Sequence, residues 1–321
     1  MFIVGLKGSF RTRGNSNTLM ATFLEKAKTL GADTHCLDIP NMDISPCRGC
    51  GTCERKGFCP IDDDMQKIYP LFRKADIIVV ATPVYFYGPS AQIKAVIDRS
   101  QALWSRKYIY KLTDPGMKQR KGIIISTGDT KGKNLFQGIN LIAKYFFDGV
   151  SAEFVESITC RGMEGIDAVR KDPTAISDSK EHAEKLLLPY LKRKKVLFLC
   201  RENACRSQMA AAFAKIHSGH IIEAESAGSS PAKEVNPIMR EVMAEKGIDM
   251  AFLKPKSYSD FDYWRPDLII QMGCGDTCPY LPGIPVEDWD LPDPAGRSID
   301  FMRGIRDEIE EKVILLQKDE K

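Results

Sequence analysis

Residues 196–207 read Val-Leu-Phe-Leu-Cys-Arg-Glu-Asn-Ala-Cys-Arg-Ser, an apolar strand that runs into a loop and then into the helix-forming segment 208–215. Cys200 ends the strand, and Arg206 follows six positions later. The N–H groups of such a loop and of a helix start can bind an oxyanion, and the arginine adds a two-pronged donor. The same positive field favours the thiolate form of Cys200, which is the nucleophile. We therefore predict a strand–loop–helix unit with a reactive thiol, the alternative being a buried cysteine at a strand end.

The C-terminal part of the chain, from about Lys194 onward, resembles the low-molecular-weight tyrosine phosphatase superfamily, which includes arsenate reductases. The resemblance rests on the Cys-x5-Arg-Ser loop, on the segments 226–228 and 247–249, and on Asp293-Pro294. It implies an α/β domain of low-molecular-weight phosphatase type in which Asp293 is the general acid. Cys205 either assists the nucleophile or packs beneath the loop. The catalytic residues that the resemblance implies in and beside this loop are Cys200, Asn203, Cys205, Arg206 and Ser207.

Two details favour the arsenate reductase branch. Asp293 is followed by Pro-Ala-Gly, as in that branch, whereas the phosphatases carry tyrosines there that grip a phosphotyrosine ring. Cys274 and Cys278 follow the apolar segment 268–271, and reduction needs extra thiols while hydrolysis does not. The resemblance implies that Cys274 resolves the arsenic adduct of Cys200 and that Cys278 takes over the disulfide. The alternative is that Cys274 and Cys278 are two ligands of a zinc site.

A second cysteine-rich stretch, residues 47–60, reads Cys-Arg-Gly-Cys-Gly-Thr-Cys-Glu-Arg-Lys-Gly-Phe-Cys-Pro. Its thiols, at Cys47, Cys50, Cys53 and Cys59, have a spacing close to that of the bacterial ferredoxin run. The compact run of three cysteines with a fourth nearby predicts a [4Fe-4S] cluster. A four-cysteine zinc site and a metal-free cysteine-rich loop are the alternatives.

Around this stretch, short apolar strands alternate with amphipathic helices, which predicts a doubly wound parallel sheet. The predicted strands are Phe2–Leu6, Thr34–Leu37, Ile77–Ala81, Gly122–Ser126 and Glu153–Ile158. The predicted helices are Asn17–Leu30, Asp64–Arg73, Ala91–Leu103, Leu135–Phe147 and Ser179–Leu191.

Ligands bind such a sheet beyond the carboxyl ends of its strands, where three loops have suitable compositions. Residues 8–18 are rich in hydroxyls, amides and glycine and suit a phosphate monoester; residues 81–88 could flank a planar ring, and residues 126–129 form the third loop. Taken in order, the loops resemble those of flavodoxin-like NAD(P)H-dependent FMN reductases. With the cysteine stretch, residues 1–190 resemble the iron–sulfur flavoproteins of that family. The predicted FMN-binding residues are Ser9, Arg11, Asn15, Ser16, Asn17, Thr18, Pro83, Val84, Tyr85, Phe86, Gly88, Thr127 and Gly128.

No Gly-x-Gly-x-x-Gly fingerprint is present, so NADH or NADPH as the donor is implied by the resemblance alone. The chain has 321 residues, 43% of them hydrophobic, and a net charge of +3, as in an ordinary soluble two-domain protein. We place the domain boundary at Lys192–Lys195, giving domains 1–192 and 193–321. The first apolar stretch is too short for a membrane helix, and basic and acidic residues interleave. We therefore expect a cytoplasmic protein with no membrane or nucleic-acid partner. We also expect a homo-oligomer.

These features together predict an arsenate reductase supplied with electrons by a fused NAD(P)H-dependent FMN and [4Fe-4S] domain. Three alternatives stay open. The first is a tyrosine phosphatase with a redox-sensing flavin domain. The second is a pair of independent activities, a flavin reductase and an arsenate reductase served by thioredoxin, ferredoxin or a low-molecular-weight thiol. The third is a non-catalytic protein that binds arsenite or carries electrons.

Overall fold

The computed structural model describes residues 1–261, 264–273 and 282–319. The chain forms two compact units, each with its own sheet. The first unit comprises Met1–Lys111 and Met117–Leu191, and the second comprises Leu112–Gly116 and Lys192–Lys321.

The first unit is built on a five-stranded parallel sheet with strand order β2-β1-β3-β4-β5. The central strands read as continuous apolar runs, because helices cover a parallel sheet on both faces. Ile77 to Ala81 in β3 and Ile123 to Ile125 in β4 are accordingly buried. The strands are β1 (Phe2–Lys7), β2 (Asp33–Asp38), β3 (Ile77–Pro83), β4 (Lys121–Gly128) and β5 (Glu153–Arg161).

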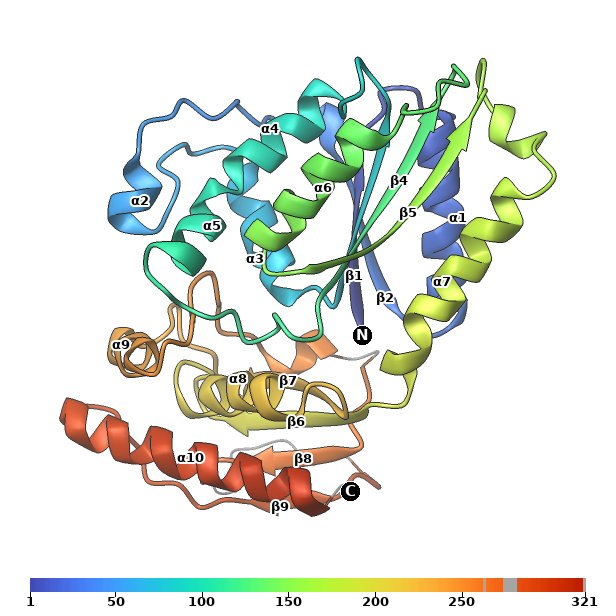
Figure 1. Ribbon diagram of the computed structural model, residues 1–321. Coiled ribbons are helices and arrows are strands. Elements are labelled where there is room, and N and C mark those ends of the chain that lie inside the picture. The colour runs from blue at the N-terminus through green and yellow to red at the C-terminus, as the bar shows by residue number, and fades with distance from the viewer. Residues whose placement is uncertain (262–263, 274–281, 320–321) are drawn as a thin grey trace. The chain divides into compact units, whose positions relative to one another are not determined.

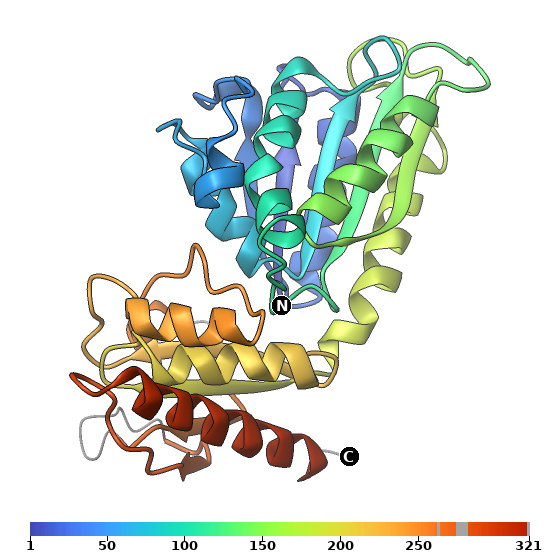
Figure 2. The same ribbon diagram turned by 60° about the vertical axis from the view of Figure 1, so that its left-hand side comes forward.

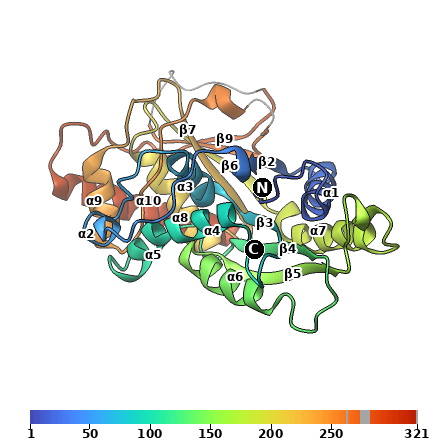
Figure 3. The same ribbon diagram turned by 90° about the horizontal axis from the view of Figure 1, so that it is seen from above.

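Helices cover both faces of this sheet: α1 and α7 lie on one face, and α3, α4, α5 and α6 lie on the other (Figure 1). The predicted helix Ala91–Leu103 is interrupted at Ser100, so it becomes α4 and α5. A short helix, α2, forms inside the cysteine-rich stretch and lies beside α5 (Figure 3). The helices are α1 (Asn15–Thr29), α2 (Thr52–Lys56), α3 (Met65–Lys74), α4 (Ala91–Arg99), α5 (Gln101–Tyr108), α6 (Gln137–Gly149) and α7 (Ala175–Leu191), with 3-10 turns η1 (Ile39–Asn41) and η2 (Ala168–Arg170).

The second unit has a four-stranded parallel sheet with strand order β7-β6-β8-β9. Helices α8 and α10 lie side by side on it (Figure 2) and bury one apolar core. Thr113, from the segment Leu112–Gly116, bonds to the backbone of Gly247 and Asp249. The elements are β6 (Lys194–Cys200), β7 (Ile222–Gly228), β8 (Leu268–Gln271), β9 (Val286–Asp288), α8 (Arg206–Ser218), α9 (Pro237–Glu245), α10 (Ile299–Asp319) and η3 (Tyr258–Phe261).

Both units are parallel α/β sheets, and the predicted fold class is confirmed. The loops singled out in the sequence follow the carboxyl ends of β1, β3, β4 and β6. Within the described residues, no helix is both long enough and apolar enough to cross a membrane.

Candidate functional site

Cys200 is the last residue of β6 and is buried. Its Sγ accepts a hydrogen bond from the backbone N–H of Asn203 at 3.2 Å and lies 3.0 Å from Oγ of Ser207. The loop before α8 and the first turn of α8 thus each place one polar group against the thiol of Cys200.

Asn203 shapes the loop between Cys200 and α8. Its φ of 49° lies in the left-handed region, which asparagine tolerates better than most residues. Its side chain donates from Nδ2 to Ser207 Oγ at 2.9 Å and accepts on Oδ1 from the N–H of Lys256 at 2.8 Å. Gln208, which sequence reasoning missed, donates from Nε2 to the Asn203 carbonyl at 2.6 Å. These bonds hold the Asn203 N–H toward Cys200.

Arg206 is buried and held on one side by carbonyls. Nη1 donates to the carbonyl oxygens of Met272 at 2.9 Å and Leu291 at 2.7 Å. Nη2 lies 3.4 Å from Oδ1 of Asp293, whose side chain is 69% exposed. The structure thus brings the predicted oxyanion-binding arginine and the predicted general acid together, although they are far apart in the sequence.

Cys205 lies at the N-cap of α8, and its thiol contacts the thioether of Met302 at 3.3 Å. Burial, reinforced by the neighbouring Cys200, raises the pKa of Cys205 to about 12. A thiol with that pKa stays protonated at neutral pH and is a poor nucleophile. Of the two roles left open for Cys205, these contacts describe packing beneath the loop.

Cys274 and Cys278 lie outside the described residues. The chain just before them is held by two hydrogen bonds between its backbone and side chains of other residues. Met272 accepts from Arg206, and the N–H of Gly273 donates to Oδ1 of Asp288 at 2.9 Å. Met272 and Gly273 are therefore held by Arg206 and Asp288.

The loop between β1 and α1 buries a row of polar side chains. Asn17 donates from Nδ2 to the carbonyls of Ser9 and Arg11 at 2.9 and 3.0 Å, which folds the loop over the helix start. Asn15 donates to the carbonyl of Gly165 at 2.9 Å, so its amide is used within the protein. Ser16 differs: within the described residues, its buried Oγ has no hydrogen-bond partner. A buried hydroxyl of this kind is available to a phosphate oxygen.

A cavity of about 420 Å³ opens at this loop. The predicted FMN-binding residues that line it are Ser9, Arg11, Asn15, Ser16, Pro83, Val84, Tyr85, Phe86, Thr127 and Gly128. Asn17, Thr18 and Gly88 are not among its lining residues; Gly88 instead exchanges two backbone hydrogen bonds of 2.9 Å with Tyr85. The sequence analysis did not predict six of the residues that line this cavity. Five of them stand in or near the three predicted loops, and the sixth, Gly165, lies in a stretch that no sequence pattern connects with cofactor binding. The missed residues are Gly14, Tyr87, Asp129, Thr130, Leu135 and Gly165.

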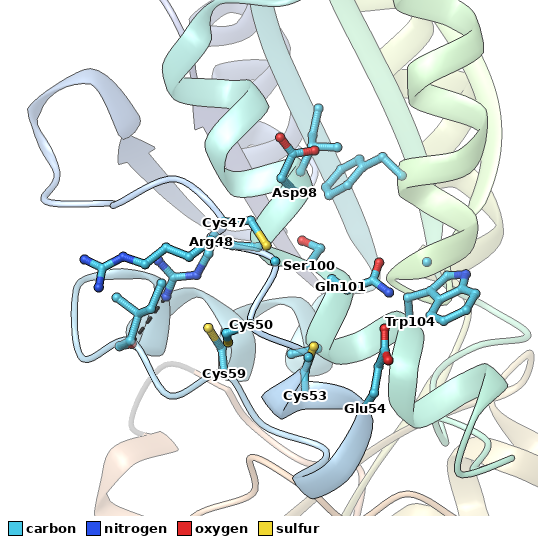
Figure 4. Close-up of a pocket in the computed structure, with 18 of the residues that line it drawn as sticks. Cys47, Arg48, Cys50, Cys53, Glu54, Cys59, Asp98, Ser100, Gln101 and Trp104 are labelled. Carbon is cyan, nitrogen blue, oxygen red and sulfur yellow. Dashed lines mark hydrogen bonds between the residues drawn. The ribbon is translucent and has the colours of Figure 1, made fainter.

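A second, larger cavity of about 950 Å³ adjoins the cysteine-rich stretch. Cys47, Cys50, Cys53 and Cys59 all line it, facing a wall from α5 and α6 that includes Trp104 (Figure 4). The four thiols are free. The Thr52 hydroxyl and backbone lower the pKa of Cys50, which favours a thiolate ligand there.

The donors at this cavity fit an iron–sulfur cluster in kind and number, because four free thiols line one space. They are not yet gathered around a point. In the part of the chain that the structure describes, no group of three or more Cys, His, Asp or Glu side chains is arranged so as to hold a metal ion.

Two family models match separate parts of the chain. Residues 1–132 match the family model of NADPH-dependent FMN reductase, and residues 195–320 match that of low molecular weight phosphotyrosine protein phosphatase. An iron-sulfur flavoprotein of Methanosarcina thermophila is 38% identical over 131 residues, which are 41% of this chain and 65% of that protein. The chain thus spans slightly less than two thirds of that relative.

Two further relatives are matched over more of their own length. An iron-sulfur flavoprotein of Archaeoglobus fulgidus is 34% identical over 46% of this chain and 73% of its own length. A glutaredoxin arsenate reductase of Synechocystis sp. is 36% identical over 37% of this chain and 93% of its own length.

These matches confirm both resemblances noted in the sequence, and they agree with the expectation of an oxidoreductase. The chain belongs, in its N-terminal part, to the iron-sulfur flavoproteins of the FMN reductase family and, in its C-terminal part, to the low molecular weight phosphotyrosine protein phosphatase family, alongside arsenate reductases.

Proposed function

We propose that this protein reduces arsenate to arsenite and that its own N-terminal unit supplies the electrons from NADH or NADPH. The observation that carries the proposal is the occurrence, in one chain, of the bonded Cys200 loop and of two cavities suited to redox cofactors. The substrate is a small tetrahedral oxyanion, since the donors at Cys200 and Arg206 are those that bind one.

The chemistry begins at Cys200. Its thiolate attacks arsenic and forms an S–As bond as water leaves, with Asp293 donating the proton to the departing oxygen. The thiolate of Cys274 then attacks the sulfur of Cys200. The new S–S bond forms as the S–As bond breaks, the electron pair stays on arsenic, and arsenite departs. Cys278 exchanges into the disulfide and releases Cys200. Two thiols are thus oxidised for each arsenate reduced.

The choice of arsenate over a phosphotyrosine ester rests on the residues around Asp293. The residues that follow it are Pro-Ala-Gly, which offer no ring to pack on a phenyl group. Hydrolysis would also leave Cys274 and Cys278 without a function. A phosphatase with a flavin sensor is therefore the weaker proposal.

The N-terminal unit would return the two electrons to the disulfide. Ser9, Ser16 and the helix start would hold the phosphate of FMN, and Cys47, Cys50, Cys53 and Cys59 would ligate a [4Fe-4S] cluster. When bound, FMN accepts hydride from a nicotinamide and a cubane cluster carries single electrons. The protein itself contributes the two cavities and, at the cysteine-rich stretch, thiols that must approach one another to hold iron.

The decisive experiment is to incubate anaerobically reconstituted protein with arsenate and NADPH or NADH alone and to measure arsenite. We expect repeated turnover without any added thiol system, and none in Cys200→Ser. Arsenite limited to a single equivalent per chain would show that the thiols reduce arsenate once and are not re-reduced from within the chain, and no arsenite at all would identify a non-catalytic arsenite-binding protein. Turnover that appears only after thioredoxin, glutaredoxin or a small thiol is added would establish two independent activities and end the internal-supply proposal.

A further inference from the structure

The cysteine loop, residues 43–64, is closed at its base by backbone and carboxylate contacts. The N–H of Asp64 donates to the carbonyl of Asp43, and the N–H of Asp43 donates to Oδ2 of Asp64, both at 2.9 Å. Between these ends, Cys47 and Cys50 are exposed and Cys53 and Cys59 are half-buried. The loop is therefore held at its ends, while its thiols stand near solvent.

A buried ion pair lies at this base. Arg99, the last residue of α4, is 1% exposed, and its guanidinium makes two hydrogen bonds to Asp63, at 2.6 and 2.9 Å. The side chain of Asp63 is 3% exposed. Two-pronged bonding of arginine to a carboxylate fixes both distance and orientation, which a lysine could not do.

The same pair grips both ends of the cysteine loop. Arg99 donates to the carbonyl of Ser45 at 2.8 Å, before Cys47, and to that of Ile61 at 3.3 Å, after Cys59. Asp63 also accepts from the N–H of Ser45 at 3.0 Å. One ion pair therefore ties together the chain entering the thiol run and the chain leaving it.

Two neighbours of the pair, Gln66 and Tyr69, bond to the backbone of Cys59 and of Arg99. Gln66 donates from Nε2 to the carbonyl of Cys59 at 3.1 Å and to that of Ile61 at 2.7 Å. Tyr69 donates from its hydroxyl to the carbonyl of Arg99 at 2.8 Å. Arg99 itself lines the cavity that the four thiols line. Gln66 and Arg99 thus share the carbonyl of Ile61, which links the chain around Cys59 to the buried pair; among the described residues, neither Asp63 nor Arg99 bonds to Cys50.

We propose that the Asp63–Arg99 pair is a latch that fixes the two ends of the cysteine loop and so positions Cys47 and Cys59 for binding metal. Fixing the ends removes part of the conformational entropy that the loop would otherwise lose when its four thiols close on one metal group. The proposal rests on the proposed cluster site and assigns to it two residues that are not ligands. Asp63 and Arg99 are positioning residues, and no electron passes through them.

A single substitution would leave one charge buried without its partner and could unfold the unit, so the test variant is the double change Asp63→Leu with Arg99→Met. Apolar side chains of similar size keep the core filled but cannot bond to Ser45 or Ile61. Retained FMN binding and an unchanged circular dichroism spectrum establish that the variant folds. Arg55→Met is the matched control, since exposed Arg55 donates to the Cys50 carbonyl at 3.2 Å but does not join the loop ends.

The probe is Co²⁺, titrated anaerobically into metal-free protein and followed by its thiolate charge-transfer absorption. We expect the double variant to bind Co²⁺ at least about tenfold more weakly than wild type, and Arg55→Met to bind like wild type. Iron content after reconstitution should fall in parallel. In the metal-free protein, iodoacetamide should label Cys59 several-fold faster in the double variant, as measured by mass spectrometry.

A folded double variant with wild-type cobalt affinity and unchanged labelling of Cys59 would overturn the latch. It would not affect the proposed function, provided that the wild-type protein takes up iron. Wild-type protein that binds Co²⁺ through four thiolates, and at least about tenfold more tightly than the folded double variant, but never takes up iron would remove the cluster from the proposed function while supporting the latch. Wild-type protein that binds neither metal would overturn the latch as a metal-positioning device.

Discussion

Cys200 and Cys205 lie in one loop, yet their surroundings give them different chemistry. Cys200 accepts a hydrogen bond from Asn203, while Cys205 contacts Met302, and burial raises its pKa to about 12. We expect Cys205→Ala to keep arsenate turnover within about threefold, because a protonated thiol takes no part, and to lower the free energy of unfolding by about 1 kcal/mol through lost packing. Steady-state kinetics and chemical denaturation measure the two effects. A loss of turnover as complete as that in Cys200→Ser would give Cys205 a catalytic role.

The raised pKa of Cys205 also predicts how stability depends on pH. The unfolded thiol ionises near its ordinary pKa of about 8.5, whereas the folded thiol holds its proton until about pH 12. The contribution of the protonated Cys205 thiol to the free energy of unfolding is therefore complete below about pH 8.5, and it is lost as the pH rises from there toward 12. Denaturation of wild type and Cys205→Ala between pH 7 and pH 10 should show a steeper decline for wild type. If the free energies of unfolding of wild type and Cys205→Ala fell equally with pH, the raised pKa of Cys205 would be contradicted.

Asp293 stands beside Arg206, but its side chain is largely exposed. A substitution there should disturb the fold little, so an effect on the rate can be assigned to proton donation. We expect Asp293→Asn to slow the reaction by about 100-fold or more, because the amide cannot donate a proton to the leaving oxygen. Asp290→Asn is the matched control, since Asp290 is an exposed carboxylate in the same segment. Single-turnover formation of the arsenic adduct, measured by mass spectrometry, reports the step directly. Equal rates in the two variants would leave Asp293 without a catalytic role.

At the scale of elements, the start of α1 carries a prediction about FMN. Ser16 is 1% exposed, and among the described residues its Oγ has no hydrogen-bond partner. A buried hydroxyl without a partner lowers the free energy of unfolding of the apoprotein, and a ligand that bonds to it removes this cost. We expect Ser16→Ala to weaken FMN binding by about tenfold while leaving the apoprotein equally stable or slightly more stable. Thr22→Ala, on the same helix, serves as the control because its hydroxyl bonds to the Thr18 carbonyl. Quenching of FMN fluorescence and thermal unfolding give the two readouts.

The elements also show where sequence reasoning ends. Strands β1, β3 and β4 follow from uninterrupted apolar runs, and the 8–18 loop follows from its hydroxyls and glycines, because these signals are local. The break between α4 and α5 was not predictable, since Ser100 interrupts a continuous helical pattern without glycine or proline. The Asp63–Arg99 pair could not be predicted either, because the two residues are far apart in the sequence and come into contact only in the folded unit. Cys200 could be predicted from its neighbours, whereas the bonds of Arg206 to Met272 and Leu291 depend on two distant loops.

At the scale of the whole molecule, the second unit includes the distant segment Leu112–Gly116. Thr113 donates to the Gly247 carbonyl at 2.6 Å and accepts from the Asp249 N–H at 2.8 Å. A fragment that starts at Lys192 lacks both bonds, each worth about 1 kcal/mol. We expect this fragment to unfold at a lower denaturant concentration than the same unit within the intact chain, and a synthetic 112–116 peptide to be too short to restore it. Identical midpoints would show that the segment adds nothing to stability.

The joining of the two units in one chain predicts how activity responds to dilution. A tether converts electron transfer between them into an intramolecular step at an effective concentration of roughly millimolar, provided that the chain around Lys192 to Lys195 lets the units meet. Specific activity with NADPH and arsenate should then stay constant as the intact protein is diluted through the nanomolar range. Fragments 1–191 and 192–321, each shown to be folded and mixed at the same concentration, should be far slower because weak partners are hardly bound. The oligomeric state must be measured across the same range, since a dissociating oligomer would also lose activity on dilution. If the mixed fragments match the intact chain, the electrons reach arsenate through a diffusing carrier, and the covalent joining of the two units has no part in the reaction.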